Sequence, residues 1–205
     1  LFAQAHGRND LQAMEHHLVR GLVVAMVLGS LVVLAMPALY LAAQMMLTAS
    51  DEVEALMARY IEVRLFAVPA ALGNAVLLGA LFGRQQMRLV LLHITLVNLC
   101  NLVLNISFVL GLGMRIEGVA LASVMAQWAG FGVTLALIRW QWRDILSGVL
   151  KRSLQMRPAW LDRRALSRFF NAGTDLTIRT FLLLSSEAVL LNSAAGLGDL
   201  ALASA

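Results

Sequence analysis

The stretch Leu89–Met114, which reads LVLLHITLVNLCNLVLNISFVLGLGM, decides the fold of this chain. It holds no formally charged side chain and exceeds the about 20 apolar residues with which a helix crosses a bilayer. Asn98, Asn101 and Asn105 lie inside it, and at about 100° per residue their side chains fall within an arc of about 60°. An unpaired amide facing lipid costs about 2–7 kcal/mol, so this asparagine stripe must face other helices or a hydrated cavity.

The asparagine stripe has two interpretations. Amides between helices hydrogen-bond across a bundle and contribute about 0.6–2 kcal/mol each, which is a purely structural role. Three amides on one face exceed what packing requires, and polar side chains inside membranes commonly mark a transport pathway. The sequence therefore favours a hydrated cavity, with Gln127 in the following apolar stretch as a weaker candidate of the same kind.

The composition places the chain in a membrane. Hydrophobic residues make up 60% of it, charged residues 14%, and the mean hydropathy is +0.78. A soluble domain of 205 residues has too little interior for that much apolar surface, so we expect an all-α, polytopic bundle of transmembrane helices. The predicted spans are Gly21–Ala43, Leu65–Gly83, Leu89–Met114, Gly118–Ile138 and Leu176–Leu197.

The charges between the spans set an orientation. Segment 44–60 is rich in acidic residues, whereas segments 84–88 and 139–175 are basic. By the positive-inside rule the basic segments face the cytoplasm, and the alternation of spans places residues 1–17 there as well. Tryptophans interleave with the arginines of 139–175, as they do in nucleic-acid binding. Beside a span, this pattern is more typical of an interfacial segment on membrane lipid, so no nucleic-acid partner is expected.

Few residues could carry chemistry. The four histidines lack metal-ligand spacing, and no phosphate-binding loop or nucleophile–base arrangement is present. The sequence therefore predicts neither an enzyme nor a cofactor or metal site. Glu187 lies near the middle of the last predicted span, where a carboxylate must be protonated or paired. A buried acid that can titrate is what a proton or cation relay requires, so Glu187 is a candidate coupling residue.

Short motifs follow one another in a characteristic order along the chain. They are Ala3-Gln4-Ala5-His6-Gly7; Tyr60-Ile61-Glu62-Val63-Arg64 with Pro69; Gly79 and Gly83 with Gln85 and Arg88; Asn98, Asn101 and Asn105 followed by Glu117-Gly118-Val119-Ala120; and Asp175-Leu176 with Arg179-Thr180 and Leu197-Gly198-Asp199. In this order they resemble helices three to seven of the multidrug and toxic compound extrusion (MATE) transporters of the MOP superfamily, and most closely the DinF-like branch.

The resemblance implies an incomplete fragment of a twelve-helix transporter with two lobes. Residues 1–138 correspond to part of the N-terminal lobe, 139–175 to a cytoplasmic linker and 176–205 to the start of the C-terminal lobe. The start at Leu1 rather than Met fits such a fragment. The resemblance further implies a monomeric antiporter of the inner membrane. It would export small cationic or amphipathic compounds against H⁺ or Na⁺ by alternating access.

Carried over by position, Asn101 and Asn105 line the cavity of the N-terminal lobe, and Asn98, Gln127 and Glu187 complete the candidate set. Many family members carry an aspartate where this chain has Asn105. An amide cannot titrate, so this position cannot relay a proton here. Two alternatives stay open: a lipid-linked precursor flippase of the same superfamily, and a non-transporting membrane scaffold in which the amides are fully packed.

Overall fold

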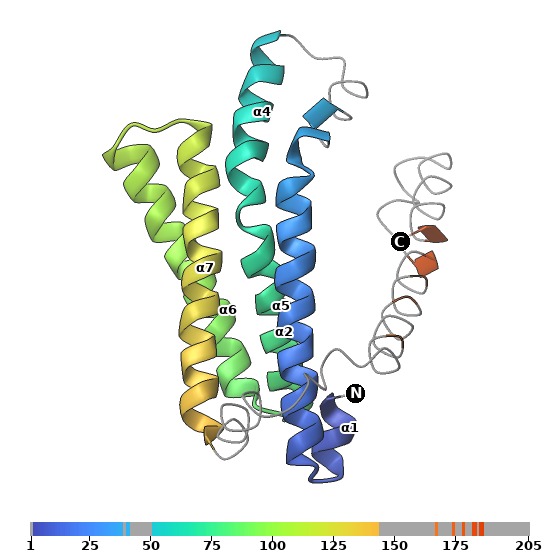
Figure 1. The fold of residues 1–205 in the computed structure, drawn as a ribbon. Coiled ribbons are helices and arrows are strands. Elements are labelled where there is room, and N and C mark those ends of the chain that lie inside the picture. The colour runs from blue at the N-terminus through green and yellow to red at the C-terminus, as the bar shows by residue number, and fades with distance from the viewer. Residues whose placement is uncertain are drawn as a thin grey trace, which may run out of the picture. The chain divides into compact units, whose positions relative to one another are not determined.

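The computed structural model describes residues 2–38, 40–41 and 51–143, and isolated positions after 143. The helices are α1 (Phe2–Gly7), α2 (Leu11–Leu34), α4 (Asp51–Leu65), α5 (Val68–Gly83), α6 (Met87–Asn105), the π-helix η1 (Ile106–Gly111) and α7 (Ile116–Gln141) (Figure 1). No strand occurs among the described residues, and the fold is all-α. The chain divides into two units, 1–157 and 158–205, and these helices all belong to the first.

Three of these helices are long and apolar enough to cross a membrane by themselves: α2, α7, and α6 continued by η1. The helices α4 and α5 pass the same test only together, as one span with a 47° bend at a short break. The described residues therefore contain up to four spans, which overlap the first four predicted from the sequence. The fifth, Leu176–Leu197, falls outside the described residues except at isolated positions.

Helix α2 is displaced toward the N-terminus relative to the predicted span Gly21–Ala43. It begins at Leu11, because the carboxylate of Asp10 caps it by accepting a hydrogen bond from a first-turn amide at 2.9 Å. It ends at Leu34, shortly before Pro37, which lacks the amide hydrogen that a continuing helix needs. The polar residues before Gly21 thus extend the helix instead of forming a separate segment.

The segment 44–60 is expected from the sequence to be a loop. In the structure α4 begins at Asp51, so the residues from Asp51 onward are helical. Hydropathy measures how favourably a segment enters lipid and not whether it is helical. The polar end of a helix is therefore not detected by it. Helix α4 is followed by a turn, and α5 begins with Pro69 in its first turn. Proline fits the start of a helix, since the amide hydrogen it lacks would have no partner there. The predicted span Leu65–Gly83 is therefore the lower part of a longer, bent span.

Helix α5 packs against both α2 and α7, and α6 and α7 form an antiparallel hairpin (Figure 1). The backbones of α2 and α5 approach each other closely near the bend. A Cβ atom built on Gly29 of α2 would lie only 2.4 Å from the Cα of Pro69. Only a residue without a Cβ allows this distance, so Gly29 sets how closely α2 approaches the bent span. The polar-headed helix α4 packs on α7.

One end of the bundle is closed by an aromatic cluster around Trp142, which is 2% exposed. The Trp142 ring stacks on Phe2 with 5.8 Å between centroids, and its indole donates to Gln86 Oε1 at 3.1 Å. The Arg84 guanidinium lies 4.7 Å from the ring centroid. Partial burial lowers the pKa of Arg84 from its ordinary value, although the group stays charged. These contacts hold α1, the α5–α6 loop and the end of α7 together.

Candidate functional site

The asparagine stripe divides between two environments. Asn98 is exposed, and its amide donates to the Ile94 carbonyl of its own helix at 2.9 Å. Asn101 and Asn105 are partly buried. The arc of about 60° that the three share therefore runs from the α6–α7 interface to its edge, with Asn98 on the outside.

Asn101 joins α6 to α7. Its Nδ2 donates to Ser123 Oγ at 3.1 Å, while its Oδ1 accepts from Asn105 Nδ2 at 2.9 Å. The Oδ1 atom of Asn105 is buried and has no hydrogen-bond partner among the described residues. An empty buried acceptor costs about 1–3 kcal/mol, so a donor from outside these helices is expected to meet it.

The backbone changes its geometry directly after Asn105. The helix η1 is a π-helix, in which the Leu112 amide donates to the Ser107 carbonyl at 3.0 Å. The Ser107 hydroxyl also donates to the Val103 carbonyl at 2.8 Å. Single π-turns inside α-helices occur frequently at functional sites. The π-helix therefore marks the same end of α6 as the unpaired Asn105 oxygen.

Gln127 faces Asn74, which is not among the candidate residues drawn from the sequence. Asn74 of α5 is 4% exposed, and its Nδ2 donates to Gln127 Oε1 at 2.8 Å and to the Gln127 carbonyl at 3.0 Å. The Oδ1 of Asn74 is buried without a partner among the described residues. A signal was available, because Asn74 is the one amide in the apolar stretch Leu65–Gly83. The structure thus adds Asn74 to the candidate set.

The break between α4 and α5 is also bonded to α7. The indole of Trp128 donates to the backbone carbonyl of Phe66 at 3.0 Å. That carbonyl lies at the turn, where the regular helical ladder is interrupted, and a donor from a neighbouring helix replaces the missing bond. The ring of Trp128 meets Phe131 edge-on, with centroids 6.1 Å apart. Trp128 of α7 thus stabilises the bend between α4 and α5.

Helix α7 is the element on which these polar contacts meet. At its beginning, Glu117 pairs with Arg59 of α4 at 3.2 Å. Near its end, Thr134 Oγ1 lies 2.7 Å from Nδ1 of the buried His93 of α6. Ser123, Gln127 and Trp128 lie between them. One helix therefore carries polar partners for α4, α5 and α6.

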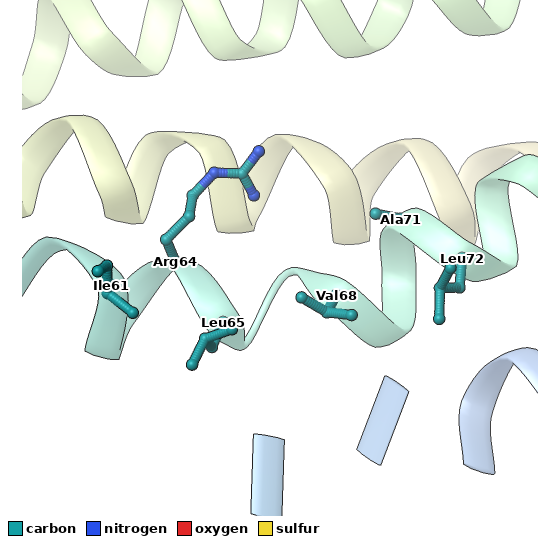
Figure 2. A pocket seen from close by; sticks show the side chains of 6 residues that line it. All are labelled: Ile61, Arg64, Leu65, Val68, Ala71 and Leu72. Atoms are coloured by element: carbon teal, nitrogen blue, oxygen red, sulfur yellow. The ribbon is translucent and has the colours of Figure 1, made fainter. Parts of the chain in front are cut away.

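A groove of about 380 Å³ follows the bent span (Figure 2). It is lined by Ile61, Arg64, Leu65, Val68, Ala71 and Leu72. Its walls are apolar except for the partly buried guanidinium of Arg64, which Figure 2 shows reaching away from the apolar side chains toward the neighbouring ribbon. Within the described residues, no acidic side chain pairs with Arg64.

Two of the earlier predictions concern metal ligands and the coupling acid. Among the described residues, no group of three or more His, Cys, Asp or Glu side chains could hold a metal ion. Glu187, the candidate coupling residue, lies outside the described residues, so its surroundings stay a prediction.

The helices and their buried amides define a multi-pass membrane protein with polar side chains inside the bundle. The MatE family model matches residues 1–107. The chain is also 33% identical, over 185 residues, to DNA damage-inducible protein F of Escherichia coli (strain K12). That match covers 89% of this chain but only 39% of the relative's length. No solved structure gives a significant match.

The chain belongs to the MatE family. This confirms the resemblance drawn from the order of the motifs, including its DinF-like branch. Members of this family are membrane transporters rather than enzymes, in agreement with the sequence prediction. The chain spans well under half of the relative's length.

Proposed function

We propose that this chain is part of a secondary active transporter that exports small cationic or amphipathic compounds across the inner membrane. A gradient of H⁺ or Na⁺ drives the export, and two lobes provide alternating access. Family membership supports the transporter class. The observation that carries the proposal is the Asn101–Asn105 pair, in which one amide is used between helices and the other leaves a buried oxygen unpaired.

The side-chain amides of Asn101 and Asn105 have different roles in this proposal. The hydrogen bond from Asn101 to Ser123 links α6 to α7. Such a bond is common between packed membrane helices and needs no further function. The Oδ1 of Asn105 has no partner among the described residues, so the packing of these helices does not explain it, whereas a scaffold would satisfy such a buried acceptor. A water, a cation or a donor on the substrate satisfies it. Asn101 and Asn105 of the asparagine stripe then form one wall of a hydrated cavity, with Asn98 outside it.

The proposed orientation places residues 1–17, 84–88 and 139–175 in the cytoplasm. Three elements from these segments meet in the aromatic cluster of Trp142, Phe2, Arg84 and Gln86. Their contact supports a common side of the membrane for all three segments. The pair Arg59–Glu117 lies at the opposite end of α7, on the side proposed to face outward.

The cavity proposal is tested at Asn105. In a cysteine-free form of the full-length protein, in which Cys100→Ala removes the one cysteine of these 205 residues, Asn105→Cys is expected to react with a membrane-impermeant, water-soluble thiol reagent. Reaction requires the thiolate and therefore water at the side chain. Added substrate is expected to slow the labelling, which is followed by mass spectrometry.

Leu99→Cys in the same background is the matched control, because Leu99 is an apolar residue 56% exposed on the same helix. In lipid its thiol has no contact with water and is expected to stay unlabelled. Equal protection of positions 99 and 105, with and without substrate and under either ion, contradicts the cavity and supports the scaffold.

Proton coupling must involve another residue, because Asn105 cannot titrate. Glu187 remains the proposed coupling acid. The variant Glu187→Gln in the full-length protein is expected to abolish ion-driven efflux while substrate binding persists, since the amide keeps the shape but not the charge. Efflux into an imposed H⁺ or Na⁺ gradient in proteoliposomes measures this. Unchanged efflux removes Glu187 from the mechanism.

A further inference from the structure

The groove along the bent span of α4 and α5 has no role in the proposed transport function. Ile61 and Leu65 lie four residues apart on α4, Val68 and Leu72 lie four apart on α5, and all four line the same groove, so they form an apolar stripe on both sides of the break. At 1.5 Å per residue the stripe is about 16 Å long. This is about half of the 30 Å hydrocarbon core, the depth of one leaflet.

Arg64 stands beside this stripe, and no acidic side chain among the described residues pairs with it. The acid nearest in sequence, Glu62, is exposed and two positions away, a spacing at which helical side chains do not face each other. Glu117, on the adjacent α7, is engaged with Arg59 at 3.2 Å. An arginine inside a span requires an anion or reaches toward the interface to find one.

We propose that the groove binds one anionic phospholipid of the leaflet that α4 enters. Arg64 lines the groove, and its flexible stem lets the guanidinium turn from the direction seen in Figure 2 to a phosphate at the edge of the groove, while an acyl chain lies along Leu65, Val68 and Leu72. The guanidinium presents several N–H donors, which suit a phosphate better than a single point charge does. The site is independent of the transport cycle and of the asparagine stripe.

The test uses the full-length protein in nanodiscs and phosphatidylglycerol with a photoactivatable acyl chain. Cross-links to the segment Leu65–Leu72, located by mass spectrometry, are expected. The same probe with a phosphatidylcholine headgroup is expected to label it weakly. Unlabelled phosphatidylglycerol is expected to compete, whereas inorganic phosphate is not, because it lacks the acyl chain.

Two variants separate the headgroup from the chain. Arg64→Gln is expected to lower specific labelling about tenfold, the effect of losing a charge-assisted bond, while Arg64→Lys retains part of it. Leu72→Trp fills the groove and lowers labelling with the charge intact. Arg59→Gln is the matched control on the same helix, since Arg59 is exposed and pairs with Glu117, and it is expected to have no effect.

Three results overturn the proposal. Equal labelling of Arg64→Gln and the parent shows that the guanidinium is not involved. Equal labelling by the two headgroups shows ordinary annular lipid. Absence of labelling in the parent protein shows that another part of the full-length chain covers the groove.

Discussion

Gly29→Ala is expected to destabilise the full-length protein strongly, although it adds a single methyl group. The new Cβ would lie 2.4 Å from the Cα and 2.8 Å from the backbone nitrogen of Pro69. Backbone atoms cannot rotate away, so α2 must move off the bent span. Overpacking of this kind costs about 1–3 kcal/mol or more, which corresponds to a loss of roughly 2–12 °C in melting temperature. Thermal unfolding in detergent measures the shift.

Gly79→Ala is the matched control for this experiment. Gly79 lies on α5 as Pro69 does, but a Cβ there would have no atom within 4 Å. In a helix, glycine to alanine without a clash is expected to be neutral or to stabilise by up to about 1 kcal/mol. If both variants melt at the same temperature, the close packing of α2 against the bend does not exist.

Asn101→Leu is expected to lower transport by the full-length protein by at least about tenfold. The change removes the donor to Ser123 and the acceptor for Asn105 together, which leaves two polar groups unpaired inside the bundle. Each costs about 1–3 kcal/mol, and the α6–α7 hairpin is expected to shift to relieve them. Efflux from proteoliposomes, normalised to the amount of inserted protein, measures the effect.

Asn98→Leu provides the comparison on the same helix. Asn98 bonds only to the carbonyl of Ile94 in its own helix, and the side chain is exposed. Its replacement leaves no interhelical group unpaired, so transport is expected to stay near the parent level. Loss of transport in Asn98→Leu, with Asn101→Leu active, would reverse the assignment of the two residues.

The spans could be predicted from the sequence because burial in lipid requires long apolar runs, and these are visible in one dimension. The family could also be predicted, since the order of motifs was preserved over the chain. The ends of the helices could not be predicted from the sequence. Hydropathy does not report the polar beginnings of α2 and α4; the Asp10 cap marks the start of α2, and Pro69 marks the start of α5 after the break.

The partners of the polar side chains were beyond the sequence as well. Periodicity placed Asn101 and Asn105 on one face of α6, but which residue of α7 lies opposite depends on how the hairpin packs. Ser123 was therefore not identified. Asn74 is visible in the sequence as the one amide in its apolar run, but its partner Gln127 appears only from the packing of α5 against α7.

The position of α7 as the common partner has a consequence for how the protein is made. Synthesis proceeds from the N-terminus, so Arg59, Asn74, His93 and Asn101 enter the translocation machinery before α7 has been translated. Until then, the α7 groups that they contact in the structure do not exist. The earlier helices are therefore expected to remain at the insertase, or in its hydrated channel, until α7 arrives. A ribosome stalled before Ile116 would hold an assembly intermediate, and chaperones and quality-control proteases would meet the bundle at this stage.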